Sequence, residues 1–294
     1  MINWKEVTIE DRDAVNALVY PSGCHSADYS FAIMYMWRKT YSPLISFADN
    51  RLLIAMPAIN MYAYPQGVGD VRPAMELLMD EAHSHGHKLM LRGLTDRTLE
   101  EFLPLYGDRF DITEDRDNSD YIYTADKLCN LPGRHLASKR NHINRFLKNG
   151  DWELRKVTNE TGIEDIKRFL DEFYDEKGDA DLEAEAEAIN EMFENFDALD
   201  ARAALLYQNG RAFAFSAGTR LDNETFDTHF EKALPDAEGA YAMINREFAR
   251  MIVDEFPEIT LFNREEDMGL EGLRKAKLSY HPDTLLMKYF AREK

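Results

Sequence analysis

Residues 202–233, "RAALLYQNGRAFAFSAGTRLDNETFDTHFEKA", decide the fold of this 294-residue chain. The dipeptide Asn209–Gly210 separates two apolar runs and is typical of a two-residue hairpin turn. A second turn, Asp222–Asn223, leads into a third run in which apolar and polar residues alternate. The stretch therefore predicts three consecutive strands.

The segments around these strands predict an α+β unit. Before them come a strand at 151–158 and helices at 162–178 and 181–196. After them come a helix at 239–256, a strand at 258–263, a helix at 270–280 and a last strand at 284–291. Helical spacing in 239–256 predicts one apolar side made of Tyr241, Ile244, Phe248, Met251 and Ile252.

The first half of the chain predicts nearly the same order of elements. A strand near 2–7 and helices at 9–19 and 28–39 precede strands at 43–48, 51–57 and 60–65. A helix at 72–85, a strand at 88–93, a helix at 97–106 and a closing strand within 110–124 follow. No residue-level repeat accompanies this order, so the duplication is inferred from the elements alone. We expect domains at 1–125 and 151–294, joined by a basic linker helix within 126–150.

The order matches the acyl-CoA N-acyltransferase (GNAT) topology. In that topology the parallel fourth and fifth strands of a unit move apart to receive the acyl donor. The expected fold is therefore α+β, with two tandem GNAT-like units, mixed sheets flanked by helices, and the active cleft in the C-terminal unit. Fold alone does not define function.

Composition and charge exclude some classes of protein. A net charge of −19 argues against a general nucleic-acid or membrane binder. The charge is uneven, however, because 127–150 holds six Lys or Arg and no acid, whereas 179–200 holds nine acids and no base. The first residues lack a signal-peptide pattern, the apolar run 52–64 is too short to span a bilayer, and Cys24 and Cys129 lie far apart. A soluble cytoplasmic protein is expected.

The third strand of the meander carries the candidate general bases. Alternation places one set of side chains toward the core and a second set on the other face, the second set being Asp227, His229 and Glu231. Two carboxylates and an imidazole on one strand suit removal of a proton from an amine or hydroxyl nucleophile. Glu231 is the first candidate and His229 the second. The alternative is a solvated face with a cross-strand salt bridge.

Residues 263–282, "NREEDMGLEGLRKAKLSYHP", contain a second group of candidates. Lys275 follows Glu271 by four residues, the spacing of an ordinary surface pair on a helix. Arg274 and Lys277 lie on another face, near the core side, and need partners there. Either the acids at 265–267 close an internal ion network, or the two cations bind a phosphate or carboxylate together with the polar turn at Asn263.

The basic segment 133–149 predicts an amphipathic helix. Leu136, Ile143 and Leu147 form its apolar stripe, and Arg140 falls inside that stripe. The cations Lys139, Arg140 and Arg145 favour a phosphate-bearing ligand, and the alternative is a solvated linker helix.

Two other motifs predict less. The loop 234–240, "LPDAEGA", has one glycine, Gly239, beside Asp236 and Glu238, so it is a poor match to a pyrophosphate loop and makes coenzyme A a doubtful donor. The histidines of "HSHGH" (83–87) lie where a helix should end, so no metal site is predicted.

Three blocks carry a resemblance to a known family. They are "DYIYTADKLCNLPGRHLASKRNHINRFLK" (120–148), "HFEKALPDAEGAYAMINREFA" (229–249) and the stretch 263–282 quoted above. They resemble, over residues 20–290, the family of the C-terminal catalytic domain of phosphatidylglycerol lysyltransferases. That family is similar to the Fem-type peptidyltransferases and is described as a tandem GNAT fold.

The resemblance implies transfer of an aminoacyl group from aminoacyl-tRNA to an amine or hydroxyl acceptor. It suggests tRNA or lipid phosphates as ligands of the basic helix and of Arg274 and Lys277, and it places Glu231 and Asp267 at the acceptor end. The chain departs from the lipid-modifying enzymes in lacking a membrane-spanning region and in its acidity. A lipid, a peptide and a small molecule all remain open as acceptor. The rival interpretation is a non-catalytic GNAT module that binds an acyl-CoA, a nucleotide or a phosphorylated metabolite.

Overall fold

A computed structural model of the chain describes residues 2–158, 160–175 and 181–294. Its contacts divide the chain into two compact units. The first unit contains Met1–Tyr121, Glu265–Glu271 and Leu285–Lys294, and the second contains Ile122–Arg264 and Gly272–Thr284. The chain thus returns twice to its first unit. The division into a domain 1–125, a linker 126–150 and a domain 151–294 stays a prediction.

The first unit is built on an eight-stranded sheet with the order β1-β2-β3-β4-β6-β15-β7, in which β5 pairs with β3. Its strands are β1 (Lys5–Glu6), β2 (Leu44–Ala48), β3 (Arg51–Met56), β4 (Met61–Ala63), β5 (Gln66–Gly67), β6 (Met90–Thr95), β7 (Phe110–Glu114) and β15 (Lys288–Glu293). Its helices are α1 (Arg12–Val19), α2 (Phe31–Met36), α3 (Arg38–Tyr41), α4 (Arg72–Ser84) and α5 (Asp96–Tyr106). The single helix predicted at 28–39 is wrong, because a break at Trp37 separates α2 from α3.

The core of the first unit lies between this sheet and helices α4 and α5. Met75 and Leu78 on α4 and Phe102 on α5 are fully buried against strand residues such as Leu53 and Leu91. The positions on α4 follow the helical spacing of its apolar residues, so one face of the helix is buried.

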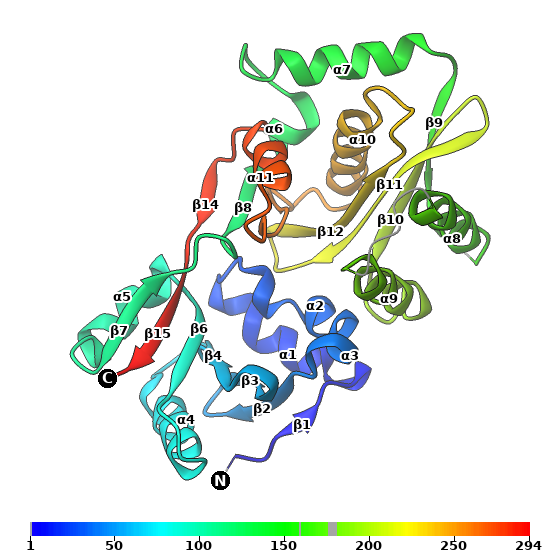
Figure 1. The fold of residues 1–294 in the computed structure, drawn as a ribbon. Helices are drawn as coiled ribbons and strands as arrows, with labels where there is room; N and C mark the ends of the chain where they lie inside the picture. Colours follow the sequence, from blue (N-terminus) through cyan, green and yellow to red (C-terminus); the bar gives the residue numbers. More distant parts are fainter. Residues whose placement is uncertain (1, 159, 176–180) are drawn as a thin grey trace. The chain divides into compact units, whose positions relative to one another are not determined.

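The second unit is built on a seven-stranded sheet with the order β14-β8-β13-β12-β11-β10-β9. Its strands are β8 (Asp120–Thr124), β9 (Trp152–Lys156), β10 (Arg202–Gln208), β11 (Arg211–Arg220), β12 (Thr225–Ala233), β13 (Leu261–Asn263) and β14 (Thr284–Leu286). Its helices are α6 (Ala125–Asn130), α7 (Ala137–Lys148), α8 (Glu160–Asp175), α9 (Asp181–Glu194), α10 (Ala240–Glu255) and α11 (Glu271–Leu278). Helix α10 packs on β10, β11 and β12, and α8 and α9 lie on the other side of these strands (Figure 1).

The two sheets share one topology, which confirms the predicted duplication. In each, an antiparallel meander (β2-β3-β4 or β10-β11-β12) is followed by a helix, α4 or α10. The helix returns the chain to a strand parallel to the third strand of the meander, β6 beside β4 and β13 beside β12. This is the order of a GNAT unit.

The closing strands of the two sheets come from opposite halves of the sequence. Strand β15 pairs with β6 and β7 in the first sheet, and β8 pairs with β13 in the second. The single last strand predicted at 284–291 is therefore wrong, because β14 and β15 join different sheets. The predicted closing strand within 110–124 is likewise two strands, β7 and β8.

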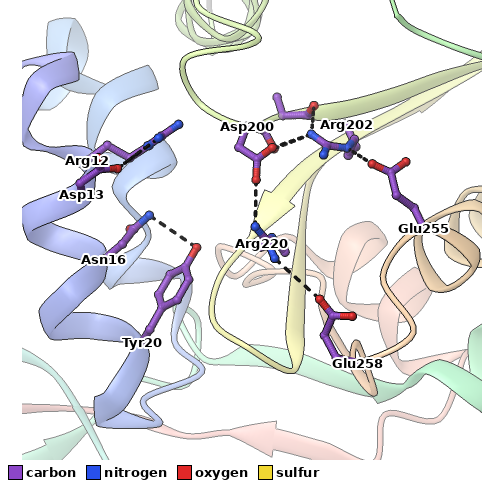
Figure 2. Close-up of polar contacts among 10 residues, drawn as sticks. Arg12, Asp13, Asn16, Tyr20, Asp200, Arg202, Arg220, Glu255 and Glu258 are labelled. Carbon is purple, nitrogen blue, oxygen red and sulfur yellow. Dashed lines mark hydrogen bonds and ion pairs between the residues drawn. The ribbon is translucent and has the colours of Figure 1, made fainter.

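Ion pairs connect the N-terminal end of β10 with the C-terminal end of β11 in the second unit (Figure 2). Arg202 binds Asp200 at 2.8 Å and Glu255 at 2.5 Å. Arg220 binds the other oxygen of Asp200 at 3.2 Å and lies 3.7 Å from Glu258. Helix α10 is thereby connected through Glu255 to the sheet that it covers.

Candidate functional site

A β-bulge interrupts strand β12 at His229. Ala217 of β11 pairs with Phe230 and Gly218 pairs with Thr228, so the register of the ladder shifts by one residue at His229. Gly218 permits the close approach of the two strands, because a Cβ at this position would lie 2.0 Å from the Asp227 carbonyl oxygen. Bulges bend a strand and redirect its side chains, often beside functional sites.

Strands β12 and β13 pair at only three positions and then part. The last pair is Asp227 with Asn263, after which β13 ends while β12 continues to Ala233. Glu231 lies on the part of β12 beyond its last pair with β13, although it still pairs with Ser216 of β11, and Arg264 directly follows β13. This is the separation of parallel strands expected for the C-terminal unit.

Glu231 joins the two diverging strands and helix α10. Its Oε1 accepts a hydrogen bond from Arg264 Nη2 at 2.8 Å, and its Oε2 accepts one from Asn245 Nδ2 at 3.0 Å. All three side chains are largely buried. A charged hydrogen bond of this kind is stronger than a neutral one and fixes both side chains in place.

His229 and Asp227 are buried beside each other. Their side chains are fully buried, with His229 Nδ1 3.6 Å from the Asp227 carboxylate and Nε2 2.9 Å from Thr219 Oγ1. Burial lowers the pKa of His229 to about 3, so the imidazole is neutral at pH 7. The alternative of a solvated face does not fit these two side chains, because both are fully buried.

Arg264 lies beside two aromatic rings, and one of its guanidinium nitrogens has no hydrogen-bond partner among the described residues. Its guanidinium carbon is 5.1 Å from the centre of the Tyr280 ring and 5.7 Å from that of Tyr123. Burial disfavours its charge, but the carboxylate of Glu231 and the two tyrosines raise its pKa on balance. Its buried Nη1 has no hydrogen-bond partner within the described part of the chain.

Lys139 approaches the same tyrosine from helix α7. Its Nζ lies 4.0 Å from the centre of the Tyr280 ring. The pKa of its ammonium is lowered to about 8, first by burial and then by repulsion from Arg264, while Glu231 acts in the opposite direction. The predicted phosphate ligand Lys139 thus lies close to the predicted base Glu231.

The predicted anion-binding residues of 263–282 differ in burial and in the contacts they make. Lys277 is buried, and its Nζ donates to the Arg264 carbonyl oxygen at 2.5 Å, which fixes the backbone that presents Arg264. Asn263 is fully buried in the β13 ladder. Arg274 is half-buried on α11, whereas Lys275 is exposed, as expected of a surface residue.

The basic side chains of α7 also contact different groups. Arg140 donates to the carbonyl oxygens of Leu131 and Gly133, and Arg145 forms an exposed pair with Glu238 at 2.5 Å. The helix spans 137–148 instead of 133–149.

The apolar stripe of α7 differs from the prediction at one position. The buried side chains are Leu136, Ile143 and Phe146, whereas Leu147 is 38% exposed. Phe146 is buried because it faces α10, where it lies close to Gly239, the residue before that helix.

The N-terminus of α10 packs against α7. Gly239 has a φ of 89°, and a Cβ there would lie 2.1 Å from the His142 carbonyl oxygen, so glycine is required on both counts. The acids of this loop are paired, Asp236 with Arg211 at 2.8 Å and Glu238 with Arg145.

The buried face of α10 is rotated from its predicted orientation. Tyr241, predicted to face the core, is 47% exposed. The buried face includes Asn245 and Ala249 beside Ile244, Phe248 and Ile252. Asn245 is therefore buried within an apolar face. Burial of its amide costs free energy unless the amide is hydrogen-bonded, as it is to Glu231.

The predicted acceptor-end residue Asp267 belongs to the first unit. It is fully buried and accepts hydrogen bonds from Tyr121 Oη at 2.5 Å, Arg116 Nη1 at 3.1 Å and the Gly269 backbone N–H at 2.9 Å. These contacts explain its burial within the first unit.

Glu266, in the same unit, should make stability depend on pH. Burial raises its carboxyl pKa to about 7; Lys288 opposes the rise, whereas Glu265, Asp120 and Asp28 add to it. The folded state therefore binds the Glu266 proton more tightly than the unfolded state does. Protonation of Glu266 contributes its full stabilisation of the folded state below about pH 4.5, and this contribution is lost as the pH rises through 7. At pH 8, Glu266→Gln should raise the free energy of unfolding by about 3 kcal/mol.

Denaturant unfolding at pH 4.5 and pH 8 measures this effect. The gain from Glu266→Gln should be small at the lower pH. The exposed Glu271→Gln is the matched control and should show no such difference. An equal gain at both pH values would contradict the assignment to Glu266.

Sequence reasoning did not identify three residues at this site: Arg264, Asn245 and Tyr280. Signals existed for two of them. Asn245 is a polar residue at helical spacing from Ile244, Phe248 and Ile252, and Arg264 follows the end of a parallel strand, where ligands often bind. Tyr280 has no comparable local signal.

The fold, two tandem GNAT-like units, is that of an acyltransferase-like class of protein. The family model "Phosphatidylglycerol lysyltransferase, C-terminal" matches residues 22–292, and the chain belongs to this family. Family and fold together suggest an acyltransferase-like function. No helix in the described ranges is long and apolar enough to cross a bilayer.

Solved structures show the same fold. A conserved protein of unknown function from Bacteroides thetaiotaomicron is 35% identical, with a TM-score of 0.93 and complete coverage of both chains. L-PGS from Bacillus licheniformis is 15% identical, with a TM-score of 0.69 over 99% of this chain and 93% of that one. FemX is 10% identical, with a TM-score of 0.59 over 100% and 98%.

A curated relative covers less of the chain. An uncharacterised protein of Mycoplasmoides gallisepticum is 22% identical over 179 residues, which are 60% of this chain and 56% of that protein. The match thus spans little more than half the length of the relative.

Proposed function

We propose that this protein transfers an aminoacyl group from aminoacyl-tRNA to an amine or hydroxyl acceptor, with its site in the second unit. The observation that carries the proposal is the arrangement of Glu231, Asn245 and Arg264 where β12 and β13 part. Family membership supports the reaction class. Because this donor is cytoplasmic, the proposal also predicts a cytoplasmic location.

Glu231 is the proposed general base. The acceptor nitrogen or oxygen attacks the acyl carbonyl carbon, and its proton passes to the Glu231 carboxylate. The ester C–O bond breaks, and the ribose oxygen of the tRNA leaves with the proton that Glu231 took from the acceptor. Arg264 and Asn245 hold the carboxylate in place, while the neutral, buried His229 lies at the bulge two residues before Glu231.

A CoA donor and a non-catalytic sensor are the alternatives. The acids Asp236 and Glu238 lie before α10, and Gly239 packs against α7, an environment that disfavours a pyrophosphate. A sensor would be stabilised by a small ligand without turnover, which separates it from a transferase.

Binding of charged tRNA across a salt series tests the donor. Arg145 and Lys148 are the exposed cations of α7, whereas Arg140 is engaged with backbone carbonyls. Arg145→Ala/Lys148→Ala should weaken binding and lower the slope of log K against log salt by about 1.5, because two phosphate contacts are lost.

Lys167→Ala/Lys275→Ala is the matched control, since it removes the same charge from exposed positions outside α7. Its binding and slope should equal those of the parent. If the parent does not bind charged tRNA even at low salt, aminoacyl-tRNA is not the donor.

A further inference from the structure

One covered lysine differs from the others in its partners. Within the described ranges, five lysines are buried or half-buried. Lys139 is one of them, and it makes no hydrogen bond or ion pair with any described residue; its Nζ instead lies 4.0 Å from the centre of the Tyr280 ring. Each of the other four has a carboxylate or carbonyl oxygen within 2.7 Å of Nζ, and they are Lys127, Lys232, Lys277 and Lys288.

The groups that face Lys139 disfavour its charge. The Tyr280 ring, after α11, replaces water on one side of the ammonium, and the Arg264 guanidinium, after β13, repels it. Glu231 on β12 acts in the opposite direction, but both of its oxygens already accept hydrogen bonds from Arg264 and Asn245. A covered ammonium without a partner of its own loses its proton more readily than a paired one.

Loss of that proton makes Lys139 a nucleophile. Because its pKa is about 8, about a quarter of the side chain is a neutral amine at pH 7.5, against about a thousandth for an ordinary lysine. The residue is half-buried, so part of it is still exposed to a reagent. Its helix, α7, contains four cations and no acid, a local excess of positive charge that attracts an anionic reagent.

We propose that Lys139 is an acylation site, at which a small acyl phosphate transfers its acyl group to the side-chain amine. The neutral Nζ attacks the acyl carbonyl carbon, an N–C bond forms, and the C–O bond to the phosphate breaks. Inorganic phosphate leaves with the electron pair of that bond, and the surplus proton on the nitrogen passes to water. The product is an uncharged amide in place of a cation of α7.

Acylation of Lys139 should also inhibit the proposed transfer reaction. The new amide adds bulk beside the Tyr280 ring, close to Glu231, and it removes a cation from the basic helix. This consequence rests on the proposed function, whereas the modification itself does not.

Pulse labelling of the whole protein with isotopically labelled acetyl phosphate, followed by mass spectrometry of its peptides, tests the site. At pH 7.5 Lys139 should be acetylated at least about tenfold faster than Lys148, an exposed lysine of the same helix. Part of the advantage in neutral amine is lost, because a less basic nucleophile is intrinsically weaker. A rate at Lys139 no greater than that at Lys148 would overturn the proposal.

Lys127 is the matched control for burial. It is also half-buried, but its Nζ lies 2.7 Å from Asp283, so its charge is stabilised. It should be acetylated more slowly than the exposed Lys148. Acetylation of Lys127 as fast as that of Lys139 would mean that the missing partner does not matter, and would overturn the argument for the site.

The pH profile of labelling is a readout that simple accessibility would not change. Between pH 6.5 and pH 7.5 the rate at Lys139 should rise nearly tenfold, and between pH 8.5 and pH 9.5 by less than about 1.5-fold, because the amine is then almost fully neutral. The rate at Lys148 should still rise about tenfold over the upper interval. Parallel profiles for the two lysines would overturn the proposal.

Lys139→Arg and the matched variant Lys148→Arg connect the modification to transfer. After treatment with acetyl phosphate, the parent and Lys148→Arg should lose transfer activity relative to their own untreated samples, whereas Lys139→Arg should keep its own. If Lys139 is labelled as predicted but no protein transfers an aminoacyl group, the acylation site stands and the proposed function is wrong. If transfer occurs and Lys139 is not labelled preferentially, the acylation site is wrong and the function stands.

Discussion

Replacing Glu231 with glutamine is expected to lower kcat for aminoacyl transfer by about a hundredfold or more. A positioned general base typically contributes that much, and glutamine cannot take the proton. The KM for the acceptor should change little, because the substitution removes the base and keeps a side chain of the same size in its place. Assays of transfer from charged tRNA to a panel of amine and hydroxyl acceptors measure the effect.

Loss of the Glu231 charge also affects stability. The carboxylate is the ion-pair partner of Arg264, and both side chains are about nine-tenths buried, so the free energy of unfolding should fall by about 2 kcal/mol. Activity must therefore be expressed per folded molecule.

Glu255→Gln is the matched control for Glu231→Gln. Glu255 lies in the same unit and accepts from Arg202 at 2.5 Å (Figure 2). It also pairs with Lys156. The substitution removes a comparable carboxylate far from the proposed chemistry. We expect Glu255→Gln to have a stability similar to that of Glu231→Gln and the kcat of the parent. If kcat falls equally in both variants, or stays within about twofold in Glu231→Gln, then Glu231 is not the base.

The order of elements was predictable because it is written in local patterns. The Asn209–Gly210 turn, the alternation of 225–233 and the helical spacing of 240–255 each act over a few residues. The exchange of closing strands was not predictable in this way. Nothing local to 284–293 indicates that β14 and β15 join different sheets, since pairing depends on contacts with distant strands.

The candidate site was predictable only in part, because it is assembled from five elements. Glu231 and Lys139 were selected by charge and strand position. Arg264 was not predicted as a site residue, because it lies in a turn rich in acids that could neutralise it. Its position depends on Lys277, which donates a hydrogen bond to its carbonyl oxygen. Arg140 carries the same charge as Lys139, but one residue along the helix turns it toward backbone carbonyls. Residue type alone does not distinguish the two.

Replacing Lys288 with methionine is expected to lower the free energy of unfolding by about 3–5 kcal/mol. The side chain is buried, and its Nζ lies 2.7 Å from Asp120 and 3.2 Å from Asp28. The two acids raise the pKa of the ammonium on balance against the effect of burial, so it stays charged at neutral pH. Without it, Asp120 and Asp28 lose a shared buried cation, although Arg92 still lies 3.5 Å from Asp28. Denaturant unfolding at pH 7 measures the loss.

A double substitution shows whether the loss comes from unbalanced charge or from packing. Lys288→Met/Asp120→Asn removes one of the two carboxylates together with the cation, so it should recover at least half of the lost stability. Lys294→Met, at the exposed end of the chain, should change stability by less than about 0.5 kcal/mol. A double variant as unstable as Lys288→Met would mean that the lysine acts through its packed methylene chain and not through its charge. Recovery would instead establish that the loss in Lys288→Met comes from the buried carboxylates that are left without their cation.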